Sequence, residues 1–141
     1  MKRITAITVC VFILIQGGAF ALEGEKHGGK HNTYPQMQKL HDMMPMYAMT
    51  LAKLEAALEK RDVAAVEAEG GKMLATTPDL KNGKPHKNLK QLKTFRSIAA
   101  SFESDLKETV ERAKKGDFTK AKDVFEKVEA KCAECHAKFR D

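Results

Sequence analysis

The segment from Phe118 to Phe139 repeats its apolar residues at intervals of three and four. The members of this stripe are Phe118, Ala121, Phe125, Val128, Cys132, Cys135 and Phe139. This spacing matches the 3.6-residue period of an amphipathic helix, which places all of them on one face. The two cysteines continue the stripe without a break, so we expect their thiols to point into the interior of the fold.

Three earlier segments have the same period. Their stripes are Leu40, Met44, Tyr47, Leu51, Leu54 and Leu58 in the first, Val63, Val66, Gly70 and Met73 in the second, and Leu92, Phe95, Ala99, Phe102, Leu106, Thr109 and Ala113 in the third. Ala, Lys, Glu and Leu dominate the composition, which is typical of helices. Residues 37–141 are therefore predicted to form an all-α, antiparallel up-down-up-down four-helix bundle.

Capping residues and helix breakers predict the ends of the first two helices. The first helix is expected to start between Met37 and Met44 and to end near Lys60. Pro45 lies either in its first turn or at a kink in a longer helix. Asp62 is of a type that caps helix N-termini, so the second helix should begin directly after it.

The second half of the chain carries similar markers. The proline- and glycine-containing run 78–85 is predicted to form the connection after the second helix. The third helix should then begin at 86–88 and end at Gly116, which follows two lysines. Asp117 is predicted to cap the fourth helix.

The cysteines of the last stripe belong to the run Cys132-Ala133-Glu134-Cys135-His136. Two cysteines three residues apart, followed directly by a histidine, form the pattern that attaches a c-type haem. The thiols add to the haem vinyl groups, and the histidine is placed to ligate the iron. A zinc site needs about four ligands, a thioredoxin-type pair expects a βαβ setting, and a structural disulfide does not require His136. We therefore predict one covalently bound haem c.

The first 21 residues have the features of a secretory signal peptide. Two basic residues precede an apolar run, and a small-residue cleavage motif ends at Ala21. The alternative is an uncleaved N-terminal anchor. Cys10 lies inside the apolar run and is expected to be removed with the leader. Export fits the cysteine motif, because haem is attached to cysteines on the oxidising side of the bacterial membrane. We predict a periplasmic protein without a stable membrane anchor.

Residues 22–36 follow the leader and lack helical periodicity, which predicts a flexible N-terminal arm. The formal net charge of the whole chain is +6. Removing the leader takes away two basic residues and no acidic ones, which leaves 6 − 2 = +4. The basic residues are spread along the chain rather than clustered, so this charge does not indicate a nucleic-acid-binding protein.

A second axial ligand should come from the first helix, because its N-terminal part lies level with the C-terminal part of the antiparallel fourth helix. Met44 lies close to the inward direction that the first stripe defines. We predict Met44 as the distal ligand and His41 as the second candidate. The alternative is that Met44 serves only as core packing, which leaves the distal position open to a small gas.

The C-terminal half of the chain resembles the class II c-type cytochromes, the cytochrome c′ family. The resemblance is carried by Phe125, the motif at 132–136, and Phe139-Arg140, and it covers about half of the mature chain. It implies a periplasmic haem bundle with Cys132 and Cys135 as attachment sites and His136 as proximal ligand. It also implies that Arg140 neutralises a haem propionate and that Phe95 packs near the ring. Members of the family often dimerise through their first two helices, so a homodimer is left open.

These features together predict a mono-haem electron carrier that exchanges electrons with redox partner proteins of the exported compartment. No acid–base pair or activated nucleophile is evident, so we predict no enzyme. One alternative is a high-spin cytochrome c′ that binds nitric oxide at an open distal site. The other is a copper-handling module, in which His27, His31, His41 and the methionines of segment 37–49 hold Cu(I).

Overall fold

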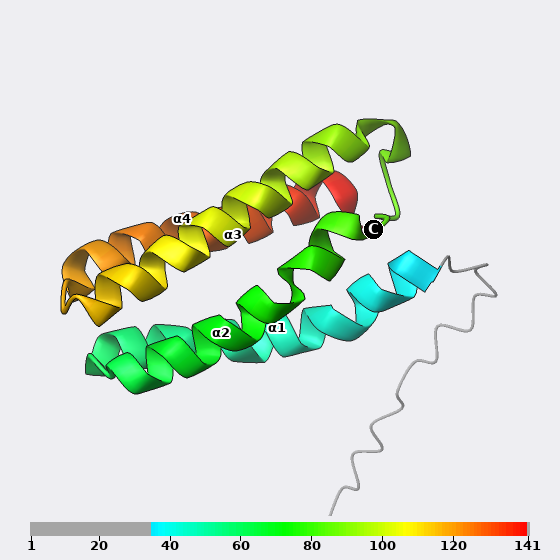
Figure 1. Cartoon of the computed structure of the whole chain (residues 1–141). Helices are drawn as coiled ribbons and strands as arrows, with labels where there is room; N and C mark the ends of the chain where they lie inside the picture. The colour runs from blue at the N-terminus through cyan, green and yellow to red at the C-terminus, as the bar shows by residue number, and fades with distance from the viewer. Residues whose placement is uncertain (1–34, 141) are drawn as a thin grey trace, which may run out of the picture. The chain divides into compact units, whose positions relative to one another are not determined.

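The computed structural model describes residues 35–140, which fold into four α-helices. They are α1 (Pro35–Lys60), α2 (Val63–Asn82), α3 (Leu92–Lys114) and α4 (Phe118–Phe139), with a short 3₁₀ helix, η1 (Leu89–Gln91), before α3. No strand occurs between residues 35 and 140. In Figure 1, α1 runs beside α2 and α3 beside α4, and α2 also packs against α3. The predicted all-α four-helix bundle is confirmed. The predicted signal peptide and residues 22–34 lie outside the described residues.

Two of the helix starts follow the capping prediction. The Asp62 carboxylate accepts a hydrogen bond from the backbone N–H of Ala65 at 3.0 Å, and the Asp117 carboxylate accepts one from Lys120 at 3.3 Å. Gly116 has φ +77°, the left-handed conformation that glycine adopts without steric cost. The α3–α4 turn is therefore specified by its own residues.

Three boundaries differ from the sequence prediction. α1 begins at Pro35, two residues inside the segment predicted as an arm, and Pro45 lies within it. α2 does not stop before Pro78 but continues to Asn82. Pro78 lacks the N–H that would bond to the carbonyl of Leu74, and the buried hydroxyl of Thr77 donates to that carbonyl at 2.9 Å instead. The third helix starts after the predicted 86–88 because η1 precedes it.

The interior is built from the predicted stripes. Buried members include Leu40, Tyr47, Leu54, Leu58, Val66, Met73, Phe95, Phe102, Leu106, Phe125 and Val128. Tyr47 and Phe102 stack with ring centroids 5.6 Å apart. The seam between α1 and α4 is packed less extensively than the other three helix seams. The bundle is therefore held mainly by the α1–α2, α2–α3 and α3–α4 contacts.

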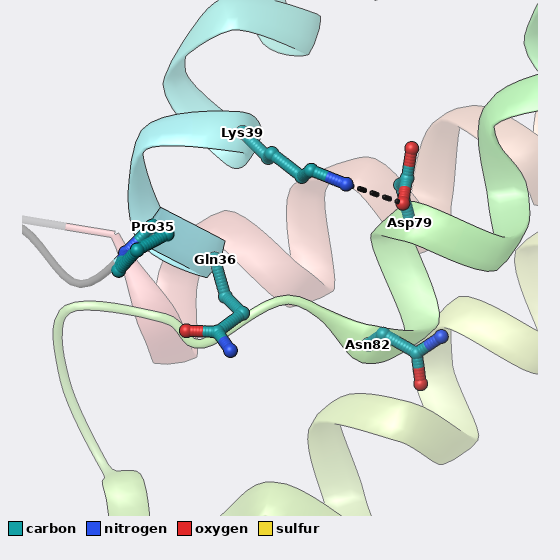
Figure 2. A pocket seen from close by; sticks show the side chains of 5 residues that line it. All are labelled: Pro35, Gln36, Lys39, Asp79 and Asn82. Carbon is teal, nitrogen blue, oxygen red and sulfur yellow. Dashed lines mark hydrogen bonds and ion pairs between the residues drawn. The ribbon is translucent and has the colours of Figure 1, made fainter.

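An ion pair joins the N-terminal part of α1 to the C-terminal part of α2. Lys39 on α1 forms an ion pair with Asp79 on α2 at 3.1 Å, at the mouth of a shallow pocket that Pro35, Gln36 and Asn82 also line (Figure 2). Both partners of this ion pair are more than half exposed, so we assign it a positional role rather than a large contribution to stability.

Gly70 allows α2 and α3 to pack closely. A Cβ atom at Gly70 would overlap Cγ2 of Val110 on α3, whose branched side chain has few alternative rotamers. We expect Gly70→Ala to lower the free energy of unfolding by about 1–2 kcal/mol, because overpacking outweighs the gain in helix propensity. Urea denaturation followed by circular dichroism measures this change.

The neighbouring glycine provides the control. A Cβ atom at Gly71 would meet nothing within 4 Å. Gly71→Ala should therefore raise the free energy of unfolding by about 0.5–1 kcal/mol through helix propensity alone. Equal stabilisation by both substitutions would contradict the close α2–α3 packing at Gly70.

Candidate haem-attachment site

The run 132–136 occupies the last turns of α4, and the helix continues through it to Phe139. The backbone N–H of Arg140 donates to the carbonyl of His136 at 3.1 Å and ends the helix. Cys132 and Cys135 are thus three residues apart on a regular helix, which places them on neighbouring turns of one face. The local structure has the register that the cysteine motif predicts.

Both thiols are half-buried against the hydrophobic core and are not joined by a disulfide. Burial raises the pKa of Cys132 to about 11, with smaller contributions from Cys135 and Glu129. Burial and then the charge of Glu134 raise the pKa of Cys135. The two side chains are therefore neutral thiols at pH 7, unlike the low-pKa cysteines of redox-active pairs.

The spacer residue Glu134 faces the solvent side of α4. Its carboxylate forms ion pairs with Lys131 and Lys138, both at 3.1 Å. Hydrogen bonds from Lys131 and then Lys138 lower the pKa of Glu134. These ion pairs run along the outer surface of the helix, while the cysteines lie against the core. The amphipathic character of α4 therefore directs the sulfur atoms inward.

His136 follows the second cysteine and has an exposed side chain. Partial desolvation, and then the positive charge of Arg140, lower the pKa of the His136 imidazole. The ring is consequently neutral at pH 7, and a neutral imidazole is the form that coordinates metals. Arg140 itself is exposed at the end of α4.

Phe95 is buried, with 2% of its surface exposed. It meets Phe139 edge to face, with ring centroids 5.3 Å apart and planes inclined by 84°. Phe139 lies three residues after His136 on α4. The structure therefore places Phe95 in the core beneath the C-terminal end of the helix that carries the cysteine motif.

The methionines of α1 take different positions. Met43 is buried in the core, with 7% exposed, whereas Met44 is half-buried and packs against the core from its edge. Thr50 is also buried, and its hydroxyl donates to the sulfur of Met46 at 3.5 Å. The inward face of α1 is therefore rotated towards Met43 and Thr50 relative to the predicted stripe.

His41, the second candidate for the distal ligand, is exposed and forms a hydrogen bond with His86. His86 lies in the connection between α2 and η1. This contact joins residues 45 positions apart in sequence, so no local sequence pattern predicts it.

Tyr47 is a further residue near the site, which sequence analysis treated only as part of the stripe. Its buried hydroxyl accepts a hydrogen bond from Thr76 at 3.0 Å. The pKa of Tyr47 is raised, mainly by burial and to a smaller extent by Cys132 on α4. Tyr47 is thus a buried polar side chain of α1 that shares the interior with the first cysteine of the motif.

Comparison with known proteins identifies the segment that carries the motif. A family model described as Cytochrome C' matches residues 85–140. Over these residues, the chain is similar to the cytochrome c′ family. The cytochrome c′ match includes α3 and α4 with the whole 132–136 run, and it does not extend to Met44 or His41 on α1. No curated protein and no solved structure matches the chain.

This match supports a c-type cytochrome and implies a haem c cofactor. The donor set fits this group, because two neutral, unpaired thiols lie on one helix face and a neutral imidazole follows the second. Within residues 35–140, no group of three or more His, Cys, Asp or Glu side chains could hold a metal ion.

Proteins of the cytochrome c′ family are generally exported. Among the helices between residues 35 and 140, none is long and apolar enough to cross a membrane.

Proposed function

We propose that this c-type cytochrome is an exported electron carrier with one haem, attached through Cys132 and Cys135 and ligated by His136. The proposal depends on one observation, the pair of half-buried, unpaired thiols on α4 with an imidazole directly after the second. When bound, haem c supplies one-electron redox chemistry at its iron. No catalysed reaction is proposed.

The remaining residues at this end of the bundle would hold and orient the group. His136 would ligate the iron on the proximal side of the haem. Because it directly follows Cys135, attachment of that cysteine would restrict where the imidazole can lie. Arg140 is a cation at the end of α4, and charge pairing with a propionate would suit its exposed position. Phe95 would supply the apolar surface beneath it, as its burial against Phe139 indicates.

Export and partner choice form part of the same proposal. A signal peptide at residues 1–21, cleaved after Ala21, would deliver the chain to the periplasm, where redox partner proteins exchange electrons with it. The mature chain would carry a formal charge of 6 − 2 = +4. Such a modest positive charge favours encounter with acidic partner surfaces.

Met44 is our proposed distal ligand. It is half-buried on α1 and packs against the same core as the two cysteines. The α1–α4 seam is the least extensively packed in the bundle, so a flat group between these helices displaces few existing contacts. His41 is exposed and bonded to His86, which makes it the weaker candidate.

An absorption spectrum of the oxidised protein tests this ligand and the function together. We expect a low-spin spectrum with an iron–sulfur charge-transfer band, because a thioether opposite His136 gives a six-coordinate iron. Met44→Leu should abolish the band and convert the protein to the high-spin form. Met49→Leu, at a position 61% exposed, should leave the spectrum unchanged.

The opposite result would favour the alternative. A high-spin spectrum in the unsubstituted protein would mean that no side chain of α1 ligates the iron. The chain would then be better described as a gas-binding cytochrome c′, and nitric oxide titration would measure its affinity.

A further inference from the structure

Two histidines from distant parts of the chain meet at one end of the bundle. Nε2 of His41 on α1 and Nε2 of His86 in the α2–η1 connection form a hydrogen bond. The ring centroids lie 4.7 Å apart, and the ring planes are inclined by 32°. Two nitrogens of the kind that most often bind metals in proteins therefore converge on one point.

The separation of the rings suits a shared metal ion. Two imidazoles that bind one ion at an N–metal–N angle of about 90–110° have ring centroids roughly 4.5–5.3 Å apart, given metal–nitrogen distances of about 2.0–2.1 Å. The observed 4.7 Å lies in this range. A metal ion could replace the shared proton if the two rings move apart.

The backbone holds His86 in place on both sides. Before it, the connection packs directly on α1, since a Cβ atom at Gly83 would lie 2.6 Å from Cδ2 of Leu40. After it, the side-chain amide of Asn88 donates to the carbonyl of Lys138 on α4 at 2.6 Å. Such fixed ligand positions reduce the conformational entropy that is lost when an ion binds.

α1 also carries a soft donor on the same face as His41. Met37 is half-buried and precedes His41 by one helical turn, which places both side chains on the same face of α1. Thioethers favour Cu(I), and imidazoles also bind copper well. Met37 therefore extends the histidine pair to a set of three donors suited to cuprous ion.

Two carboxylates at this end of the α1–α2 pair are engaged by other side chains. Asp42 accepts a hydrogen bond from Gln38 at 2.9 Å, and Asp79 forms an ion pair with Lys39 at 3.1 Å (Figure 2). Hard cations such as Mg²⁺ and Ca²⁺ require oxygen ligands. The local chemistry favours a soft ion over these.

We propose that His41 and His86 form a Cu(I) site with the Met37 thioether as third ligand. The site uses residues of α1 and of the α2–η1 connection and none of the 132–136 run, and it does not depend on the proposed electron-carrier function. It differs from the copper alternative of the sequence analysis, because the partner of His41 is His86 rather than the histidines of the arm.

Equilibrium dialysis of the haem-loaded protein against chelator-buffered Cu(I), with copper measured by atomic absorption, tests the site. We expect one copper ion per chain. His41→Gln and His86→Gln should each raise the Kd at least tenfold, and thermal unfolding without copper should be nearly unchanged. X-ray absorption of the bound copper should show nitrogen and sulfur ligands, and the sulfur contribution should disappear in Met37→Leu.

Variants elsewhere supply the controls. A double His27→Gln, His31→Gln variant should keep the copper affinity of the unsubstituted protein. Unaltered affinity in His41→Gln and His86→Gln, or loss of binding only in the double variant, would overturn the proposed site. A sulfur signal that persists in Met37→Leu would overturn the assignment of the third ligand.

Discussion

Replacing both Cys132 and Cys135 with serine should yield a protein without covalently attached haem. The two thiols are the only cysteine side chains within residues 35–140, and both lie against the core on α4. Serine has nearly the same size but forms no thioether link, so the bundle can fold while attachment fails. Haem staining of a denaturing gel, where only covalent haem is retained, measures the result.

Single substitutions and a leader variant complete this experiment. Cys132→Ser and Cys135→Ser should each leave at most one thioether link and reduce the retained haem. Cys10→Ser alters the remaining cysteine of the chain, which lies in the predicted leader, and should keep the full haem content. Retention of haem on the gel by the double variant would show that attachment uses other residues.

Phe95→Ala should have the largest effect on stability of the substitutions considered. Phe95 is 2% exposed and packs edge to face on Phe139 with centroids 5.3 Å apart. Removing a buried phenyl ring lowers the free energy of unfolding by about 3–5 kcal/mol, through lost burial and the cavity that remains. Urea denaturation of the haem-loaded protein measures the loss.

Leu89→Ala is the control for this substitution. Leu89 lies in η1 close to Phe95 in sequence, but it is 49% exposed. Its removal should change the free energy of unfolding by about 0.5 kcal/mol or less. A loss below about 1 kcal/mol for Phe95→Ala would mean that the ring does not pack tightly in the haem-loaded bundle.

The number of helices and several of their ends could be predicted because they depend on neighbouring residues. The alternation of three- and four-residue steps sets the inward face of α4, and Cys132 and Cys135 lie against the core as predicted. Asp62 and Asp117 cap their helices within three residues. Such short-range interactions can be read directly from the sequence.

The predicted end of α2 was wrong. Proline was expected to end the helix because it lacks a backbone N–H, but a neighbouring side chain can supply the missing hydrogen bond. Pro78 removes one backbone donor, but the Thr77 hydroxyl supplies another to the same carbonyl of Leu74. The helix therefore continues to Asn82. A threonine directly before an internal proline is the sequence feature that could have indicated this.

The inward face of α1 was predicted only in part, because the predicted stripe of this helix did not include its buried threonine. Thr50 is 4% exposed, and its hydroxyl finds a partner in the sulfur of Met46. Including Thr50 rotates the buried face towards Met43. The burial of a polar residue depended on a local partner that the apolar pattern does not record.

The contact between His41 and His86 could not be predicted from local pattern. It depends on how the α2–η1 connection packs on α1, where Gly83 approaches Leu40. No short-range rule relates residues 45 positions apart. The metal site proposed there therefore required the tertiary structure.

The mass of the protein purified from the exported fraction tests the central claim most directly. We predict the mass of the chain from Leu22 onwards plus one haem, with no thiol available for alkylation after denaturation. A mass equal to that of the chain alone, together with alkylation of both Cys132 and Cys135, would contradict covalent attachment on α4.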